Sequence, residues 1–319
     1  MSILVFIESA EGAIKKSSLE AVSFAAAMAN GSPVVAVAMG SIDSSALAQA
    51  GAAGASKVLH IADARLDQGI IQAYATAIAA AMAKEGAKTL VLAKSSLGDP
   101  VAARVAIKTN ASLVSNVAEL PNTNGGFKVK RSIYTGKAFA EVELTAETKI
   151  LAIKKNAVTL KEDGAPASVE AFSVDFGAND FGMNITSTDK TTGEILLPEA
   201  EIVVSGGRGM KGPENWGMLE DLAKALGAAT GCSKPVSDIG WRPHHEHVGQ
   251  TGVKVSPNLY IAVGISGAIQ HLAGVNSSKV IVVINKDADA PFFKAADYGI
   301  VGDAFEVVPK LTEAIKAAK

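Results

Sequence analysis

The feature of this sequence that most constrains its fold is an alternation of short apolar runs with longer helix-favouring segments. The apolar runs cover residues 3–7, 34–39, 57–61 and 89–93, and alanine-rich segments lie between them. A run that is apolar at nearly every position is typical of a strand buried on both faces, as in parallel sheets that helices cover. The alternation therefore predicts an α/β fold with a mostly parallel sheet.

The pattern changes between residues 124 and 153. Residues 127–134, 138–144 and 149–153 are short runs with the composition of strands, and turn-like segments separate them. Closely spaced strands without helices between them are typical of antiparallel pairing. We therefore expect these three strands to form an antiparallel extension of the first sheet.

Two short motifs mark expected helix starts. Ser17 and Glu20 have the spacing of a capping box, with Ser17 as the N-cap residue of a helix that runs to about residue 28. Asp99 and Pro100 place an N-cap residue and a first-turn proline before a helix that runs to about residue 109. Both motifs predict helices that cover the first sheet.

A polar stretch separates two α/β patterns. Residues 186–194 hold few apolar side chains, which is typical of a linker. A chain of 319 residues has room for about two domains. We therefore expect an N-terminal α/β domain over residues 1–195 and a C-terminal α/β domain over residues 196–319.

Charge and cysteine content exclude several classes of protein. The formal net charge is −2 at pH 7, so the chain has no overall basic field that would attract nucleic acid or an anionic membrane surface. Cys232 is the single cysteine, which excludes an internal disulfide framework and a multi-cysteine metal site. A chain with one cysteine suits a reducing compartment.

The sequence favours a protein that does not insert into a membrane. The long uncharged stretch over residues 21–39 contains a turn signal at residues 30–33, and residues 256–278 carry too many hydrogen-bonding side chains for a lipid-facing span. The first strand begins almost at the N-terminus, without a basic leader or an arginine-rich transit segment. We therefore expect a cytoplasmic location, as in a bacterium. A eukaryotic source would imply the mitochondrial matrix, but no transit peptide is present.

Polar or glycine-rich segments follow four of the expected strands in the second half. Residues 206–212 follow one strand, residues 264–271 follow another, and Asn285 and Asp303 follow two more. In an open parallel sheet the carboxyl ends of the strands line the crevice in which nucleotides bind. The four strand ends therefore predict one shared nucleotide pocket.

The first of these segments has the form of a dinucleotide fingerprint. Gly207, Gly209 and Gly212 match G-x-G-x-x-G between a strand and a helix. Such glycines let a phosphate approach backbone N–H groups, and Arg208 would neutralise its charge. The acidic residue that the fingerprint places about twenty positions later is missing. A tight strand-to-helix turn without a ligand is therefore an alternative.

Other candidate residues also have two interpretations. Ser266 and Gly267 either seat a phosphate at a helix start or simply cap the helix. His271, about one turn later, is either a ligand contact or a core residue. Residues 244–247 (His-His-Glu-His) lack the spacing of metal ligands on one helix face, so we expect a solvated loop. Nothing around Cys232 indicates a low-pKa thiolate, so we expect an unreactive thiol.

The C-terminal third contains long motifs in a fixed order. They cover residues 259–274 and 280–285, with shorter blocks at residues 206–209, 248–252 and 296–303. These motifs resemble the electron transfer flavoprotein α-subunit family. The resemblance implies a Rossmann-like C-terminal domain that binds FAD and an N-terminal domain that contacts a β-subunit in a heterodimer. It also implies an AMP, which is expected in the β-subunit.

The same motifs imply roles for individual residues. Arg208 is implied to lie near the flavin and its phosphates, the Thr251 hydroxyl near flavin N5, and His271 at the N1 and C2 carbonyl edge. Asn285 and Asp303 are implied to hold the adenosine half. The full set of residues implied to bind FAD is Arg208, Ser233, Lys234, Val248, Gly249, Gln250, Thr251, Ser266, Gly267, Ala268, Ile269, Gln270, His271, Asn285, Asp303 and Ala304.

Lys234 departs from the family pattern, which usually has arginine beside the flavin ring. Lysine keeps the positive charge but loses the planar guanidinium that stacks on a ring. Lys234 and His271 are thus two potentially cationic side chains at the flavin. Positive charge there would raise the reduction potential of the flavin.

The resemblance implies an electron carrier without a substrate conversion of its own. Its FAD would take electrons from flavin dehydrogenases, such as the acyl-CoA dehydrogenases of fatty-acid β-oxidation, and pass them to a membrane quinone oxidoreductase. An alternative is a subunit of an NADH-oxidising, bifurcating flavoprotein, whose distinguishing features lie largely in the β-subunit. A third interpretation is a regulatory module that binds an adenine nucleotide.

Overall fold

The computed structural model describes residues 2–136, 138–187 and 196–318. The chain divides into two compact units, one of residues 1–133 and 138–188 and the other of residues 134–137 and 189–319. The linker predicted over residues 186–194 lies almost entirely outside the described residues.

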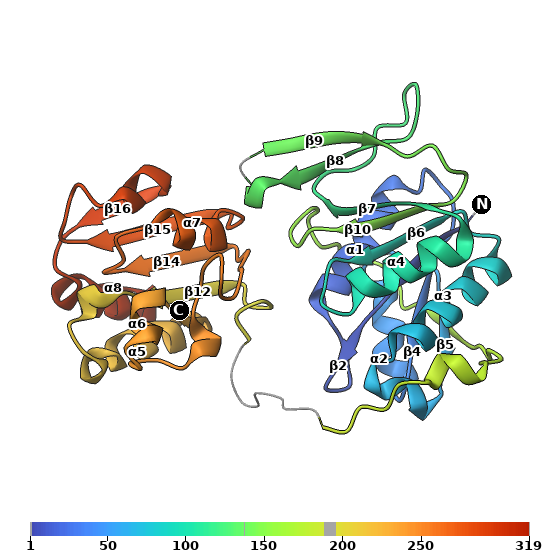
Figure 1. Ribbon diagram of the computed structural model, residues 1–319, viewed down its shortest axis with the longest axis horizontal. Helices are drawn as coiled ribbons and strands as arrows, with labels where there is room; N and C mark the ends of the chain where they lie inside the picture. The colour runs from blue at the N-terminus through green and yellow to red at the C-terminus, as the bar shows by residue number, and fades with distance from the viewer. Residues whose placement is uncertain (1, 137, 188–195, 319) are drawn as a thin grey trace. The chain divides into compact units, whose positions relative to one another are not determined.

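The first unit is built on a nine-stranded sheet (Figure 1). Neighbouring strands pair in parallel from β11 at one edge of the sheet as far as β7, and β8 and β9 extend the sheet through antiparallel pairs. The strand order is β11 (Ser168–Ala171), β5 (Lys57–Ile61), β4 (Val34–Met39), β1 (Ile3–Phe6), β6 (Thr89–Ala93), β10 (Lys149–Ile153), β7 (Ser112–Val117), β8 (Lys128–Ile133) and β9 (Ala138–Glu143). A small antiparallel pair, β2 (Ser9–Ala10) and β3 (Ala13–Ile14), follows β1. The predicted α/β class with a mostly parallel sheet is therefore confirmed.

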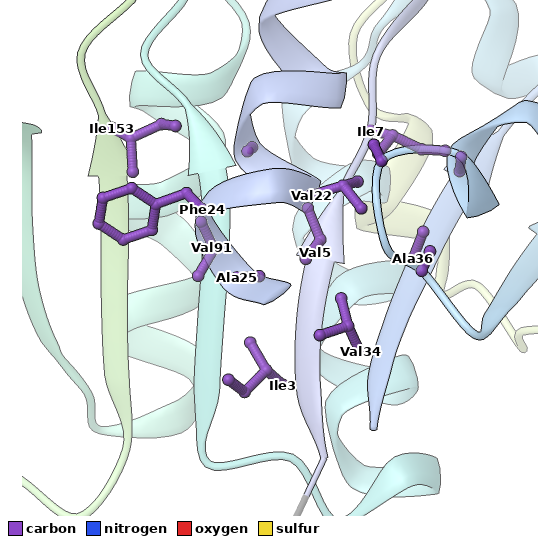
Figure 2. Close-up of a cluster of buried hydrophobic side chains, with 14 of the residues drawn as sticks. Ile3, Val5, Ile7, Val22, Phe24, Ala25, Val34, Ala36, Val91 and Ile153 are labelled. Carbon is purple, nitrogen blue, oxygen red and sulfur yellow. The ribbon is translucent and has the colours of Figure 1, made fainter. Parts of the chain in front are cut away.

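Helices cover both faces of this sheet. One face packs against α1 (Lys16–Met28) and α2 (Ser44–Ala48), and the other packs against α3 (Ile71–Glu85) and α4 (Gly98–Thr109). Figure 2 shows the apolar cluster on the α1 face, in which side chains of β1, β4, β6 and β10 gather against the helix. Burial of these apolar side chains is the main stabilising contribution to such a layered fold.

Three predictions of local structure are wrong. β10 pairs in parallel with β6 and β7, so it belongs to the parallel sheet and only β8 and β9 form the antiparallel extension. Helix α1 begins at Lys16, two residues earlier than the capping box requires, and the Glu20 carboxylate accepts from the N–H of Asn156 instead of closing the box on Ser17. Helix α4 begins at Gly98, whose N–H donates to the Ser95 hydroxyl at 2.7 Å, and so Asp99 lies inside the first turn.

The second unit contains a five-stranded, fully parallel sheet. The strand order is β13 (Ala229–Cys232), β12 (Ile202–Gly206), β14 (Leu259–Val263), β15 (Val280–Asn285) and β16 (Tyr298–Val301). Numbered within the unit this order is 2-1-3-4-5, which is that of flavodoxin-like doubly wound sheets. The order in which strands are added reverses between β12 and β14, because the chain goes from β12 to β13 on one side and then returns to β14 on the other. Such sheets bind ligands at this switch point.

The helices of the second unit also lie on both faces of its sheet. Helices α5 (Gly217–Leu226) and α8 (Ala304–Ala318) contribute to one apolar cluster, together with the short α6 (Lys234–Asp238). Helix α7 (Ile269–Val275) contributes to the other cluster. Within the described residues, none of the helices has the length and apolar character needed to cross a membrane.

Candidate functional site

A cavity of about 550 Å³ lies at the carboxyl ends of β12, β13, β14 and β15 in the second unit. It sits at the switch point between β12 and β14, as the strand-end pattern predicts. Five segments of the chain form its wall. The lining residues are Arg208, Gly209, Ser233, Lys234, Pro235, His247, Gly249, Gln250, Thr251, Gly264, Ile265, Ser266, Ala268, Gln270, His271, Asn285 and Asp287.

The glycine loop after β12 packs directly against the loop after β14. The N–H of Gly207 donates to Val263 O at 2.9 Å, and the N–H of Gly209 donates to Gly264 O at 3.0 Å. A Cβ atom at Gly207 would lie 2.2 Å from the Gly264 carbonyl oxygen. These glycines therefore allow two loops to touch, and their N–H groups are not available to a phosphate. The fingerprint interpretation of residues 207–212 is wrong in this respect.

The loop after β14 instead leaves its backbone donors free. In the described part of the chain, no hydrogen bond uses the N–H groups of residues 266–270. The Asn285 side-chain amide donates to Ile265 O at 3.0 Å, and the N–H of Phe292 donates to Ser266 O at 3.0 Å. These two contacts hold the loop at the start of α7, where unpaired N–H groups favour a negatively charged group.

The segment over residues 247–251 forms the opposite wall. The N–H of Val248 donates to Cys232 O at 2.9 Å, which attaches the segment to the end of β13. The N–H of Gln250 donates to Gln270 O at 2.8 Å, which attaches it to α7. Gln250 and Thr251 are thereby held at the cavity by backbone contacts at both sides.

His271 is a buried member of the wall, with 6% of its surface exposed. Its Nε2 lies 2.9 Å from the Tyr260 hydroxyl, and its ring packs edge-on against Phe292. Burial, and then the nearby His247, lower the pKa of His271 to about 4, against the opposing effect of the Val248 backbone. The ring is therefore neutral at pH 7, and the expectation that His271 supplies positive charge is wrong.

His247 was not predicted as a site residue. It is 2% exposed and lines the cavity, and burial lowers its pKa. Glu246 beside it is 3% exposed and accepts hydrogen bonds from Arg242 at 2.6 and 2.9 Å. The expectation of a fully solvated loop over residues 244–247 is therefore wrong for its second half. Among the described residues, no group of three or more His, Cys, Asp or Glu side chains could hold a metal ion.

Two side chains give the cavity positive charge. Arg208 is exposed at its rim, and no ion pair of the described residues involves its guanidinium. Lys234 donates to both carboxylate oxygens of Asp238 at 2.8 Å, one turn along α6. Because about half of each of these two side chains is exposed, the pair is screened by solvent and orients Lys234 more than it stabilises the fold.

Most of the predicted site residues meet at this cavity, and five do not line it. Val248 is fully buried behind the wall, Gly267 packs against Phe292, and Ile269 points to solvent. Asp303 accepts from the N–H of Phe305 at the start of α8, and Ala304 belongs to the core. The lining residues that were not predicted individually are Pro235, His247, Gly264, Ile265 and Asp287, and Gly209 was predicted only as a member of the glycine fingerprint.

We expect Cys232 to resist alkylation in the folded chain. Burial, together with the charge of Glu246, raises the pKa of its thiol to about 12. At pH 8 its thiolate fraction is then about three orders of magnitude below that of a free cysteine. Iodoacetamide labelling at pH 8, followed by mass spectrometry, should be at least about 100-fold slower in the folded chain than in urea. Similar rates in both states would contradict this burial.

The second unit thus has the architecture of a doubly wound α/β cofactor-binding domain, with a cavity at its switch point. Residues 196–276 match the family model described as "Electron transfer flavoprotein FAD-binding domain", and residues 3–176 match "Electron transfer flavoprotein domain". The chain belongs to the electron transfer flavoprotein α-subunit family.

Full-length relatives support this assignment. The chain is 41% identical to an electron transfer flavoprotein subunit alpha of Mycobacterium tuberculosis, over 99% of both chains. It is 40% identical to that of Pseudomonas aeruginosa, over 99% of this chain and 100% of the relative. It is 36% identical to that of Bacillus subtilis, over 98% of this chain and 97% of the relative.

Proposed function

We propose that the cavity of the second unit binds the FAD of an electron transfer flavoprotein. The observation that carries this proposal is that the N–H groups of residues 266–270 make no hydrogen bond among the described residues, in a loop that lines a cavity of suitable size at the switch point. The two cationic side chains of the rim, Arg208 and Lys234, suit a ligand with a diphosphate. The FAD-binding description of the matched family model supports the choice of ligand.

The inner wall also fits a ligand with a polar ring. The Nδ1 atoms of His247 and His271 are both buried and have no hydrogen-bond partner among the described residues. Burying such groups unpaired is costly, so a ligand that pairs them gains affinity. The residues present therefore fit a flavin nucleotide at the level of charge, donors and volume.

Different residues of the chain would bind different parts of FAD. Residues 266–270 would pair the diphosphate through backbone N–H groups, and Arg208 would neutralise it. Lys234 would add positive charge near the ring, while the neutral His271 would contribute a hydrogen bond rather than a charge. When bound, FAD supplies one- and two-electron transfer, and the protein positions it and sets its potential.

The proposed role is that of an electron carrier subunit in a heterodimer with a β-subunit that holds AMP. It would take electrons from flavin dehydrogenases, including those of fatty-acid β-oxidation, and deliver them to a membrane quinone oxidoreductase from the cytoplasm. The first unit would contact the β-subunit. Its exposed apolar side chains, such as Ile107, Leu120 and Phe139, support a role as an interaction surface.

The test is to purify the chain with its β-subunit and to titrate the complex with reductants. We expect a yellow heterodimer with one FAD, which an acyl-CoA dehydrogenase and its substrate bleach and which NADH alone does not. Rapid bleaching by NADH alone would contradict the electron-carrier role and favour an NADH-oxidising flavoprotein. A colourless heterodimer that binds adenine nucleotides would favour the regulatory module instead.

A further inference from the structure

Tyr260 is a fully buried tyrosine directly behind the cavity wall. It lies on β14, next to the switch point, and its side chain has 0% exposure. Its hydroxyl lies 2.9 Å from Nε2 of His271, and its ring packs near Phe292, which also contacts His271. Tyr260 and Phe292 thus both contact the imidazole, and neither of them lines the cavity.

The hydrogen bond between Tyr260 and His271 has a preferred direction. The His271 ring is neutral, so it carries one hydrogen, on Nδ1 or on Nε2. If Nε2 donated, the hydrogen of the buried Tyr260 hydroxyl would need another acceptor, but the nearby Ser205 hydroxyl lowers the pKa of the phenol, as a donor to its oxygen does. If Tyr260 donates, Nε2 is the acceptor, so the single ring hydrogen of His271 lies on Nδ1. The hydroxyl hydrogen of Tyr260 is then paired.

Donation from the Tyr260 hydroxyl to Nε2 also agrees with the surroundings of the ring. The Val248 backbone favours a proton on the imidazole, as a carbonyl acceptor near the ring does. Nδ1 has no hydrogen-bond partner of good geometry among the described residues. The Nδ1–H group thus lies near the Val248 backbone and makes no hydrogen bond of good geometry in a residue that lines the cavity.

We infer that Tyr260 is a positioning residue of the flavin site, whose hydroxyl donates to Nε2 of His271 and fixes the imidazole as the neutral Nδ1–H form. This inference rests on the proposed function for its ligand, while the state of the ring is a property of the chain itself. His271 would then present one fixed tautomer to the ligand, with a hydrogen-bond donor and no positive charge. Tyr260 would act on the flavin only through His271.

The experiment is a two-bond ¹H–¹⁵N spectrum of the heterodimer with ¹⁵N-labelled histidine. The His271 signals are assigned by their loss in His271→Gln. In the parent we expect Nδ1 at the shift of a protonated nitrogen and Nε2 at that of an acceptor. In Tyr260→Phe we expect both signals to move toward the average of the two tautomers and the pKa of His271 to rise, because the donor that favours the neutral ring is gone. The flavin potential of Tyr260→Phe should shift as well.

Tyr74→Phe is the matched control. Tyr74 is a buried tyrosine of the first unit whose hydroxyl donates to Leu66 O at 2.8 Å, so this variant also loses one buried hydrogen bond. It should leave the His271 signals and the flavin potential unchanged. A parent spectrum with the hydrogen on Nε2, or Tyr260→Phe signals identical to the parent, would overturn the inference even if Tyr260→Phe proved too unstable for other assays. A parent without FAD would instead refute the proposed function and leave the tautomer result standing.

Discussion

Gly207→Ala is expected to destabilise the second unit by about 2–3 kcal/mol, as overpacking in a tight contact does. The added Cβ would lie 2.2 Å from the backbone oxygen of Gly264, which cannot move without disturbing the loop after β14. Urea unfolding of the α chain, followed by tryptophan emission, measures this loss. Both tryptophans, Trp216 and Trp241, lie in the second unit, so their emission reports on that unit alone.

Gly217→Ala is the matched control for this steric argument. A Cβ atom at Gly217 would meet no atom within 4 Å, and the residue lies at the start of α5. Replacing a helical glycine by alanine should stabilise the unit by about 0.5–1 kcal/mol. If Gly207→Ala and Gly217→Ala had the same unfolding midpoint, the close contact between the two loops would be disproved.

Arg242→Met is expected to cost about 3 kcal/mol of unfolding free energy, because it leaves a buried carboxylate without its partner. Arg242 donates to Glu246 at 2.6 and 2.9 Å, and Glu246 is almost inaccessible to solvent. Methionine keeps the length of the side chain and removes its charge. The tryptophan emission of the α chain in urea again measures the change.

Lys161→Met provides the control for the loss of a charge pair. Lys161 and Asp163 are 3.6 Å apart and both are largely exposed, so their pair should contribute less than about 1 kcal/mol. We expect a clear shift of the unfolding midpoint for Arg242→Met and almost none for Lys161→Met. Equal shifts would show that Glu246 is not held as a buried ion.

Strands that are apolar throughout could be predicted closely from the sequence. The runs over residues 34–39, 57–61 and 89–93 match β4, β5 and β6, because burial on both faces forces such residues into a central strand. β13 was missed, since Ala229–Cys232 consists of small residues with a weak strand signal. The parallel pairing of β10 was also missed, because the neighbour of a strand is decided by distant parts of the chain.

The site was predictable where it depends on strand ends and unpredictable where it depends on an irregular loop. Parallel strands bring their carboxyl ends to one edge, so the segments after β12, β14 and β15 meet there as expected. His247 joins them only because the Arg242–Glu246 ion pair and the backbone contact with Cys232 fold its loop inward. The neutral state of His271 likewise depends on burial, which the sequence does not display.

Blocking the cavity of the second unit is the most direct test of whether it holds FAD. Ala268 lines the cavity and is exposed, so Ala268→Trp fills it without disturbing the core. Ala314→Trp places the same side chain on an exposed position of α8 as the control. The measurement is FAD binding to the apo-heterodimers by flavin fluorescence. We expect at least about a tenfold weaker affinity for Ala268→Trp, a loss of about 1.4 kcal/mol or more, and parent affinity for Ala314→Trp. Parent affinity in both variants would contradict FAD binding in this cavity.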